Sequence, residues 1–272
     1  HSNKPLVIEG VVPKLALSYQ ADSDRLYYAT YSEGFRPGGF NRGGGINSVN
    51  PDYPDVQTTY DTDDVINYEA GWKTLLLDRE FRFNGSVYFI QWNNMQVSRF
   101  DPVNVSILTF IDNAADAQIK GIELDMMYRA TGNLTFYGAL SYNHTKLVGV
   151  NSQVIEIAPI GSELPLTPKF QTSLRTRYDW QMAEFDAHWQ LGVQYAGQSY
   201  SSIVMQERER QDSFTTVNFS IGIGNDNWSV KLYADNLTDE RATLFINNQD
   251  DTRRITTNRP TTIGLSFTYD YY

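Results

Sequence analysis

Apolar and polar residues alternate along almost the whole chain with a period of two, which is typical of β-strands and not of helices. In residues 65–76, one face carries Tyr68 and Trp72. The opposite face carries Glu69 and Lys73. The same alternation predicts about eleven strands and no helix, with the strands near residues 11–20, 24–35, 64–77, 80–99, 115–130, 133–148, 168–180, 184–201, 213–225, 227–241 and 259–272.

The connections between these segments alternate between short and long. The short ones contain Gly, Asn and Asp, the residues of tight turns, at 21–24, 77–80, 130–133, 180–184 and 224–227. The long ones are polar and rich in Pro, Gly, Asn and Asp, at 36–63, 100–114, 149–167, 202–212 and 242–258. Short turns at one end and long loops at the other predict an antiparallel up-and-down meander, the arrangement of outer-membrane barrels.

Aromatic residues decide between a membrane barrel and a soluble sandwich. They make up 14% of the chain, and 18 of them are tyrosines. Many stand at the ends of the apolar rows, where rings with a polar tip suit the boundary between lipid and water: Tyr68, Trp72, Tyr128, Phe136, Tyr142, Trp189, Tyr195, Trp228 and Tyr269. We therefore predict an all-β, antiparallel transmembrane β-barrel. Bacterial single-chain barrels close with even strand counts, so about eleven strands indicate either a miscount or part of a larger barrel.

Composition removes several function classes. The formal net charge is −10, which argues against a nucleic-acid partner. No nucleophile elbow, phosphate-binding loop or paired-carboxylate motif is visible, so we expect neither an enzyme nor a cofactor. The three histidines are scattered, and no transition-metal site is indicated. The acidic runs at 61–64 and 249–251 lack the spacing of a calcium loop and are expected to be solvated.

Six segments occur in an order and spacing that resemble one family. They are Tyr28–Asn41, Asn67–Thr74, Asp112–Asp125, Leu164–Phe170, Tyr233–Glu240 and Arg259–Tyr272. Each is weak alone, but together they resemble the C-terminal half of a TonB-dependent outer-membrane receptor over essentially the whole chain.

That resemblance implies a barrel of about 22 strands whose lumen holds an N-terminal plug. Residues 1–272 would then be the C-terminal part of the barrel, with the plug and the N-terminal barrel strands absent from the chain, as in a fragment or a split receptor. The implied function is TonB-energised uptake of a scarce nutrient such as siderophore-bound iron, cobalamin or a saccharide. The implied location is the outer membrane of a Gram-negative bacterium, with the C-terminus in the periplasm.

The same resemblance names partners. These are membrane lipid and lipopolysaccharide, the plug and the remaining strands on the same or a second chain, TonB through the absent N-terminal segment, and the barrel-assembly machinery. The last strand carries a pattern that resembles the recognition signal of that machinery, at Thr262, Gly264, Phe267 and Tyr269. Ordinary lipid-facing alternation explains much of the same pattern.

Two other functions remain open at this stage. A passive porin-like channel of about twelve strands would need one more strand and a periplasmic start. An extracellular β-rich binding or adhesion module would need its apolar faces to meet each other.

Candidate site residues fall into two groups. Aromatic and basic residues on outer loops suit capture of an anionic or ring-bearing ligand, although loops tied to neighbouring loops would look alike: Arg36, Phe40, Asn41, Arg42, Tyr53, Tyr60, Asn247, Asn248, Arg253 and Arg254. Charged residues on the polar, lumen-facing rows are expected to meet the plug or to pair within the wall: Glu69, Lys73, Glu123, Asp125, Arg175, Arg177, Lys231 and Asp235.

Overall fold

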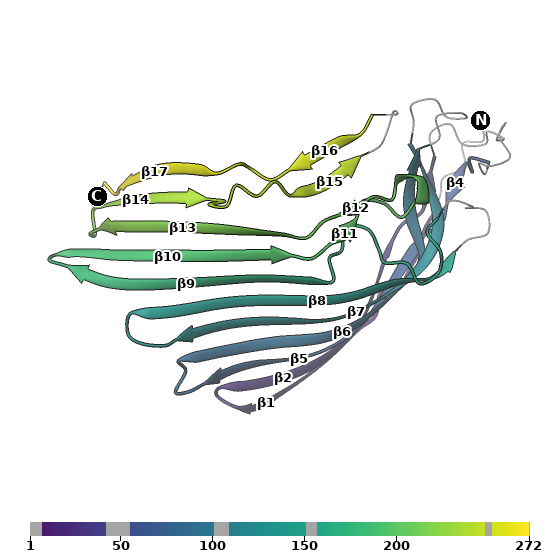
Figure 1. Ribbon diagram of the computed structural model, residues 1–272. Helices are drawn as coiled ribbons and strands as arrows, with labels where there is room; N and C mark the ends of the chain where they lie inside the picture. The colour runs from purple at the N-terminus through teal and green to yellow at the C-terminus, as the bar shows by residue number, and fades with distance from the viewer. Residues whose placement is uncertain (1–6, 42–54, 101–108, 151–156, 248–251, 272) are drawn as a thin grey trace.

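A computed structural model describes residues 7–41, 55–100, 109–150, 157–247 and 252–271. It contains one antiparallel sheet of eleven strands that follow each other in chain order (Figure 1). The strands are β1 (Lys14–Asp22), β2 (Arg25–Arg36), β5 (Asp63–Leu76), β6 (Phe81–Phe100), β7 (Thr109–Arg129), β8 (Leu134–Val150), β9 (Phe170–Met182), β10 (Phe185–Ala196), β13 (Phe214–Gly224), β14 (Trp228–Asp235) and β17 (Thr262–Tyr269). The prediction of an all-β up-and-down meander is confirmed.

The long connections contain secondary structure that alternation did not predict. Three short hairpins stand there: β3 (Gly39–Phe40) with β4 (Thr59–Tyr60), β11 (Ser199–Tyr200) with β12 (Arg210–Gln211), and β15 (Thr243–Asn247) with β16 (Arg254–Thr257). A single 3₁₀ turn, η1 (Met205–Glu207), lies between β11 and β12. No helix among the described residues is long and apolar enough to cross a bilayer.

Several strand boundaries differ from the sequence prediction, and the largest differences, of six residues, are at the start of β7 and the end of β14. The loop expected at 100–114 is shorter, because β6 and β7 stay paired as far as the Phe100–Thr109 pair. The strand expected to reach residue 241 ends at Asp235. The next residue, Asn236, has a left-handed backbone (φ 52°), and its side-chain amide donates to the carbonyls of Glu240 and Arg259. This local network turns the chain out of the sheet.

Strand register gathers the apolar rows on one face and the polar rows on the other. On the apolar face, rings contact one another across strands at two levels. Near the long connections, the Tyr31 and Tyr68 ring centroids lie 5.2 Å apart. Near the short turns, Phe81 contacts Tyr128 at 5.8 Å and Phe185 contacts Trp228 at 5.5 Å. Two levels of aromatic contact are the pattern expected where a lipid-facing sheet meets water on each side.

On the polar face, large rings lie flat over glycines of the neighbouring strand. The register pairs Tyr28 with Gly71, Tyr88 with Gly121, His188 with Gly222 and Tyr233 with Gly264. In each case a Cβ on the glycine would collide with the ring. The absence of a side chain at these positions lets the rings lie against the sheet instead of projecting from it. The side chains on this face therefore extend only a short distance from the backbone and leave space in front of the sheet.

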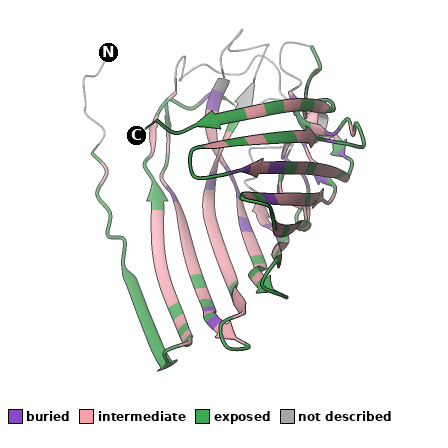
Figure 2. Cartoon of the chain, turned by 90° about the vertical axis from the view of Figure 1, so that its left-hand side faces the viewer, coloured by how far each residue is buried: buried purple, intermediate pink, exposed green. Residues whose placement is uncertain are grey.

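Both outer strands of the sheet are unpaired on one side. In the described part of the chain, β1 and β17 end the strand order and do not pair with each other. All nine residues of β1 are exposed, and Figure 2 shows this strand exposed along its length. Leu17, Leu265 and Phe267 are 72%, 70% and 65% exposed on these edge strands. A long, apolar open edge is unfavourable in water and in lipid alike, so the sheet has the features of part of a larger barrel.

Adjacent residues of β10 test the assignment of the two faces. Leu191 lies on the apolar face, and Gln190 lines a hollow on the polar face. In the assembled barrel, Leu191→Arg should lower the free energy of unfolding by roughly 2–4 kcal/mol, since a cation at the lipid midplane is that unfavourable. Gln190→Arg should lower it much less. Urea titration of barrels folded into lipid vesicles measures both, and equal losses would show that the two faces are wrongly assigned.

Candidate functional site

The candidate site is the rim formed by the outer ends of β5, β6 and β7 and the connections above them. A strand needs about 9–11 residues to cross a membrane, whereas β6 has 20 residues and β7 has 21. In a membrane, about half of each of these strands would extend beyond the lipid. Figure 1 shows the long connections gathered at this end of the sheet.

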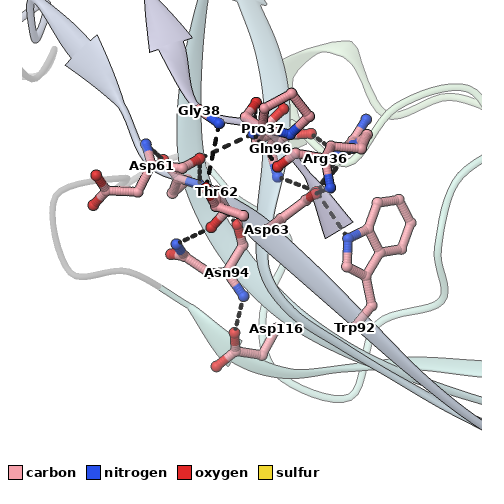
Figure 3. A network of polar contacts seen from close by, with 11 residues as sticks. Arg36, Pro37, Gly38, Asp61, Thr62, Asp63, Trp92, Asn94, Gln96 and Asp116 are labelled. Atoms are coloured by element: carbon pink, nitrogen blue, oxygen red, sulfur yellow. Dashed lines mark hydrogen bonds and ion pairs between the residues drawn. The ribbon is translucent and has the colours of Figure 1, made fainter. Parts of the chain in front are cut away.

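A buried carboxylate stands at the base of the longest connection. Arg36 and Asp63 are the last register pair of β2 and β5, and Asp63 is only 1% exposed. The Arg36 guanidinium donates to both carboxylate oxygens, with Nε at 3.1 and 3.0 Å. Trp92 Nε1 donates to Oδ2 at 2.9 Å, and the Gln96 backbone N–H donates to it at 3.2 Å (Figure 3). One carboxylate thus joins three strands.

Gln96, whose backbone N–H binds Asp63, also holds both ends of the 37–62 connection. The Gln96 side-chain amide donates to the carbonyls of Pro37 (3.1 Å) and Asp61 (2.9 Å). Further along, the Asn41 side chain makes two hydrogen bonds of 2.8 Å with the backbone of Ile111 on β7. The connection is therefore fastened to β6 and β7 as well as to its own strands.

The electrostatics of Asp63 favour its charged form. Burial by itself raises the pKa of a carboxyl group, but hydrogen bonds from Arg36, Trp92 and Gln96 and the charge of Arg36 outweigh it. The pKa of Asp63 is consequently held below its ordinary value. A carboxyl group with a lowered pKa stabilises the fold above its ordinary pKa, and this contribution is lost as the pH falls through the lowered value.

An apolar cluster covers the polar face of the outer ends of β6–β8. Leu147 is fully buried there, and Ile157 and Ile203 are 6% and 5% exposed. The Ala158 backbone N–H donates to the Ile203 carbonyl at 2.9 Å, which joins the β8–β9 connection to the β10–β13 connection. The two connections thus form one packed unit, which we call the outer cap.

Arg208 strengthens this cap from within. Its guanidinium donates to the carbonyls of Ser202 (2.7 Å) and Glu163 (2.8 Å) and lies 4.0 Å from the centroid of the Tyr200 ring. Burial lowers the pKa of Arg208 from its ordinary value, yet an arginine at neutral pH stays charged. The buried charge is compensated by the two carbonyls and the ring.

The predicted ligand-binding residues differ in how far their side chains are engaged. Arg36 is paired with Asp63, Arg253 is paired with Glu209 at 2.8 Å, and Asn41 holds the backbone of β7. Tyr60 lies against Gly39, and Asn247 and Arg254 also have interaction partners. Phe40 is 57% exposed at the rim. Arg42, Tyr53 and Asn248 lie outside the described residues.

The eight predicted lumen charges share the polar face, and they divide into two sets. Four have partners within the wall: Glu69 accepts from Tyr28 at 2.7 Å, Asp125 pairs with Arg82 at 3.1 Å, Arg177 pairs with Asp179 at 2.8 Å, and the Arg175 guanidinium lies 4.1 Å from the centroid of the Tyr137 ring. The others have no ion pair among the described residues, although the Lys231 ammonium lies 5.9 Å from the centroid of the Tyr233 ring, and all are exposed: Lys73, Glu123, Lys231 and Asp235. The second set is available to a partner inside the lumen.

Part of this face is hollowed. A groove of about 570 Å³ crosses the middle strands and is lined by Lys73, Glu123 and Asp125 together with neutral polar residues such as Ser141 and Gln194. The predicted assembly signal lies on β17, away from this groove. There Gly264 is explained by the Tyr233 ring above it, and Thr262 donates to the Pro260 carbonyl at 3.0 Å.

Sequence reasoning missed the residues that organise the rim. The run at 61–64 was expected to be solvated, which is wrong for Asp63, because Arg36, Trp92 and Gln96 surround its carboxylate. The available signal was the antiparallel meander itself, which brings the start of one strand beside the end of the strand before it. The outer cap had no such signal, because its apolar residues come from connections far apart in sequence.

Comparisons with known proteins agree on the fold. A family model described as TonB dependent receptor-like, beta-barrel, matches residues 3–237. The ferric yersiniabactin uptake receptor FyuA from Yersinia pestis matches with a TM-score of 0.75 and 17% identity, over 95% of this chain and 37% of that chain. BauA, the ferric preacinetobactin receptor from Acinetobacter baumannii, matches with 0.70 and 19%, over 96% and 36%.

The siderophore receptor PiuA from Acinetobacter baumannii also matches, with a TM-score of 0.70 and 16% identity, over 95% of this chain and 35% of that chain. The chain therefore spans little more than a third of the length of these structures. At these identities the likeness concerns the fold.

Asp63→Asn tests whether the buried carboxylate fastens the 37–62 connection. Removing the charge leaves the Arg36 guanidinium without its counter-ion, and breaking such a buried contact costs about 1–3 kcal/mol. In the assembled barrel, protease should cut the connection about tenfold faster or more, and amides at the outer ends of β2 and β5 should exchange faster. Arg36→Met should add little to Asp63→Asn, because both changes break the same contact.

Asp61→Asn is the matched control. Asp61 is exposed, and its hydrogen bonds to Asn113 and Gln96 use its backbone N–H and carbonyl. Its change should leave protection as in the wild type. If both variants are cut at the wild-type rate, the carboxylate of Asp63 does not hold the connection.

Proposed function

Since this chain belongs to the TonB-dependent receptor β-barrel family, we propose that it supplies the C-terminal half of an outer-membrane barrel that takes up a ferric siderophore. Members of this family are transporters and not enzymes, and they reside in the outer membrane of Gram-negative bacteria. The observation that carries the proposal is the polar face. It combines flat rings, a groove and four charges that have no ion pair among the described residues, at the position of a barrel lumen.

The plug is the partner that this face fits best. A passive lumen needs only water-compatible residues, whereas Lys73, Glu123, Lys231 and Asp235 offer both signs of charge at fixed places. Fixed charges of both signs suit a protein domain of complementary charge. The plug and the remaining strands would come from the same or a second polypeptide, and TonB would act through the N-terminal segment of that plug.

Orientation follows from the connections. Outer-membrane barrels carry their short turns on the periplasmic side and their long loops outside. The rim with the outer cap would then face the medium and gather the ligand, and the C-terminus after β17 would lie in the periplasm. The assembly machinery would act on β17, where Phe267 and Tyr269 are 65% and 60% exposed on an open edge.

A ferric siderophore ranks first among the nutrient classes expected from the sequence. FyuA and BauA are receptors of ferric siderophores, and an exposed aromatic at the rim, Phe40, suits a ligand that carries rings. Cobalamin and saccharides remain alternatives. A passive pore of about twelve strands is disfavoured, because both β1 and β17 are open edges in the described part of the chain.

Radiolabelled iron uptake tests the proposal. The complete receptor, with its plug, is expressed in a host that lacks its own siderophore receptors, and a panel of ferric siderophores is supplied. At least one should be taken up, and uptake should vanish when TonB is deleted. Diffusion of small solutes that persists without TonB would favour the passive channel instead, and energised uptake of cobalamin or a saccharide alone would overturn the siderophore class.

Phe40→Ala tests the outer ligand surface. A stacked ring contributes about 0.5–1.5 kcal/mol beyond its buried area, so the Kd for the transported siderophore should rise about tenfold. Tyr271→Ala is the control, because Tyr271 is 91% exposed after β17, at the opposite end of the sheet. Binding is measured by quenching of intrinsic fluorescence, and an unchanged Kd in Phe40→Ala would remove Phe40 from the ligand surface.

A further inference from the structure

Three basic residues gather on the apolar, outward face, just beyond the aromatic level near the long connections. The register pairs Phe89 with Lys120 and Lys120 with His144. Lys146 follows two residues later on β8, opposite Gln118. Because successive side chains of a strand alternate between faces, Lys120, His144 and Lys146 stand on the same side as the lipid-facing Phe89.

This cluster is unusual in a chain whose formal net charge is −10. Lys120 and Lys146 are diagonal neighbours on adjacent strands, about 7–8 Å apart, where their like charges repel each other. Within the described residues, neither lysine has an ion pair. Glu123 of β7 stands on the opposite face, and Asp116, four residues before Lys120, accepts the Asn94 backbone N–H at 2.7 Å. The wall therefore concentrates positive charge at this place without neutralising it.

The position of the cluster indicates what neutralises it. Below it the face is apolar and open, with Tyr142 and Leu174 45% and 49% exposed. The Lys120 ammonium lies 5.3 Å from the centroid of the Phe89 ring, so it is held at the level of the aromatic contacts. In an outer membrane, the groups at the boundary between acyl chains and water are lipid headgroups, and those of the outer leaflet carry phosphate.

We propose that Lys120, His144 and Lys146 form a binding site for the phosphate of an outer-leaflet glycolipid, whose acyl chains lie along the apolar face below. Lysine binds phosphate as a point charge, and Gln91 and Gln118 beside the cluster supply neutral donors to the sugar hydroxyls. The proposal rests on the orientation given under the proposed function, in which the long connections face outward. The site would fix one lipid against β7 and β8, beneath the rim.

The test uses the complete receptor extracted in mild detergent and examined by native mass spectrometry. The wild type should retain lipid A, and Lys120→Gln combined with Lys146→Gln should weaken lipid A binding about tenfold or more, since each basic residue near an anionic lipid surface contributes appreciably. His144→Gln should have a smaller effect. Arg25→Gln combined with Arg79→Gln is the control, because it removes the same charge at the short-turn end.

Each outcome decides the proposal. Equal retention of lipid A by the wild type and the double lysine variant overturns it. Equal binding of dephosphorylated lipid A shows that the acyl chains and not the phosphate are recognised, which also overturns it. Displacement of the lipid by inorganic phosphate at millimolar concentration indicates a free-anion site. Iron uptake by the same variants is measured separately, so a failed lipid site leaves the uptake proposal standing, and a failed uptake assay leaves the lipid result interpretable.

Discussion

Backbone hydrogen bonding is the constraint on which the rest of this structure depends. A sheet that faces lipid has no water to satisfy its N–H and C=O groups, so each strand must pair along its length with its neighbours. The eleven strands do so in chain order, without a crossover. Among the described residues, β1 and β17 each lack a partner strand on one side, and this is the physical reason why the sheet belongs in a larger closed barrel.

Because the backbone is paired along every strand, the two faces of the sheet differ only in their side chains. Outward rows can be apolar throughout because lipid accepts them. Inward rows carry rings and charges, and there the glycines beneath Tyr28 and Tyr88 decide how far a ring projects. A wall built in this way has few projecting side chains, which would suit the plug proposed as its partner. The same alternation brings basic residues outward where the lipid ends, at Lys120 and Lys146.

Beyond the lipid, a different kind of interaction holds the structure together. At the outer ends of β6 and β7, water can satisfy backbone groups, so strand pairing is not required there. The connections above them are instead held by contacts between residues far apart in the sequence. Asp63 fastens one connection by gathering three donors from β2 and β6. The outer cap fastens two others by burying Leu147 and its neighbours. The surface proposed to gather the ligand is thus carried by loops that are themselves packed and hydrogen-bonded.

The sequence by itself determined the eleven strands of the main sheet, their antiparallel order, the polar and apolar faces, and the resemblance to a receptor family. The sheet, its order and its faces follow from local alternation and turn chemistry, which need no knowledge of distant contacts, and the resemblance rests on six motifs in a fixed order. It did not determine that Arg36 and Arg253 are engaged by Asp63 and Glu209, nor that Asp63 is buried. Only the tertiary structure decided these points, because the partners lie 27 and 44 residues apart and meet only when the strands are in register.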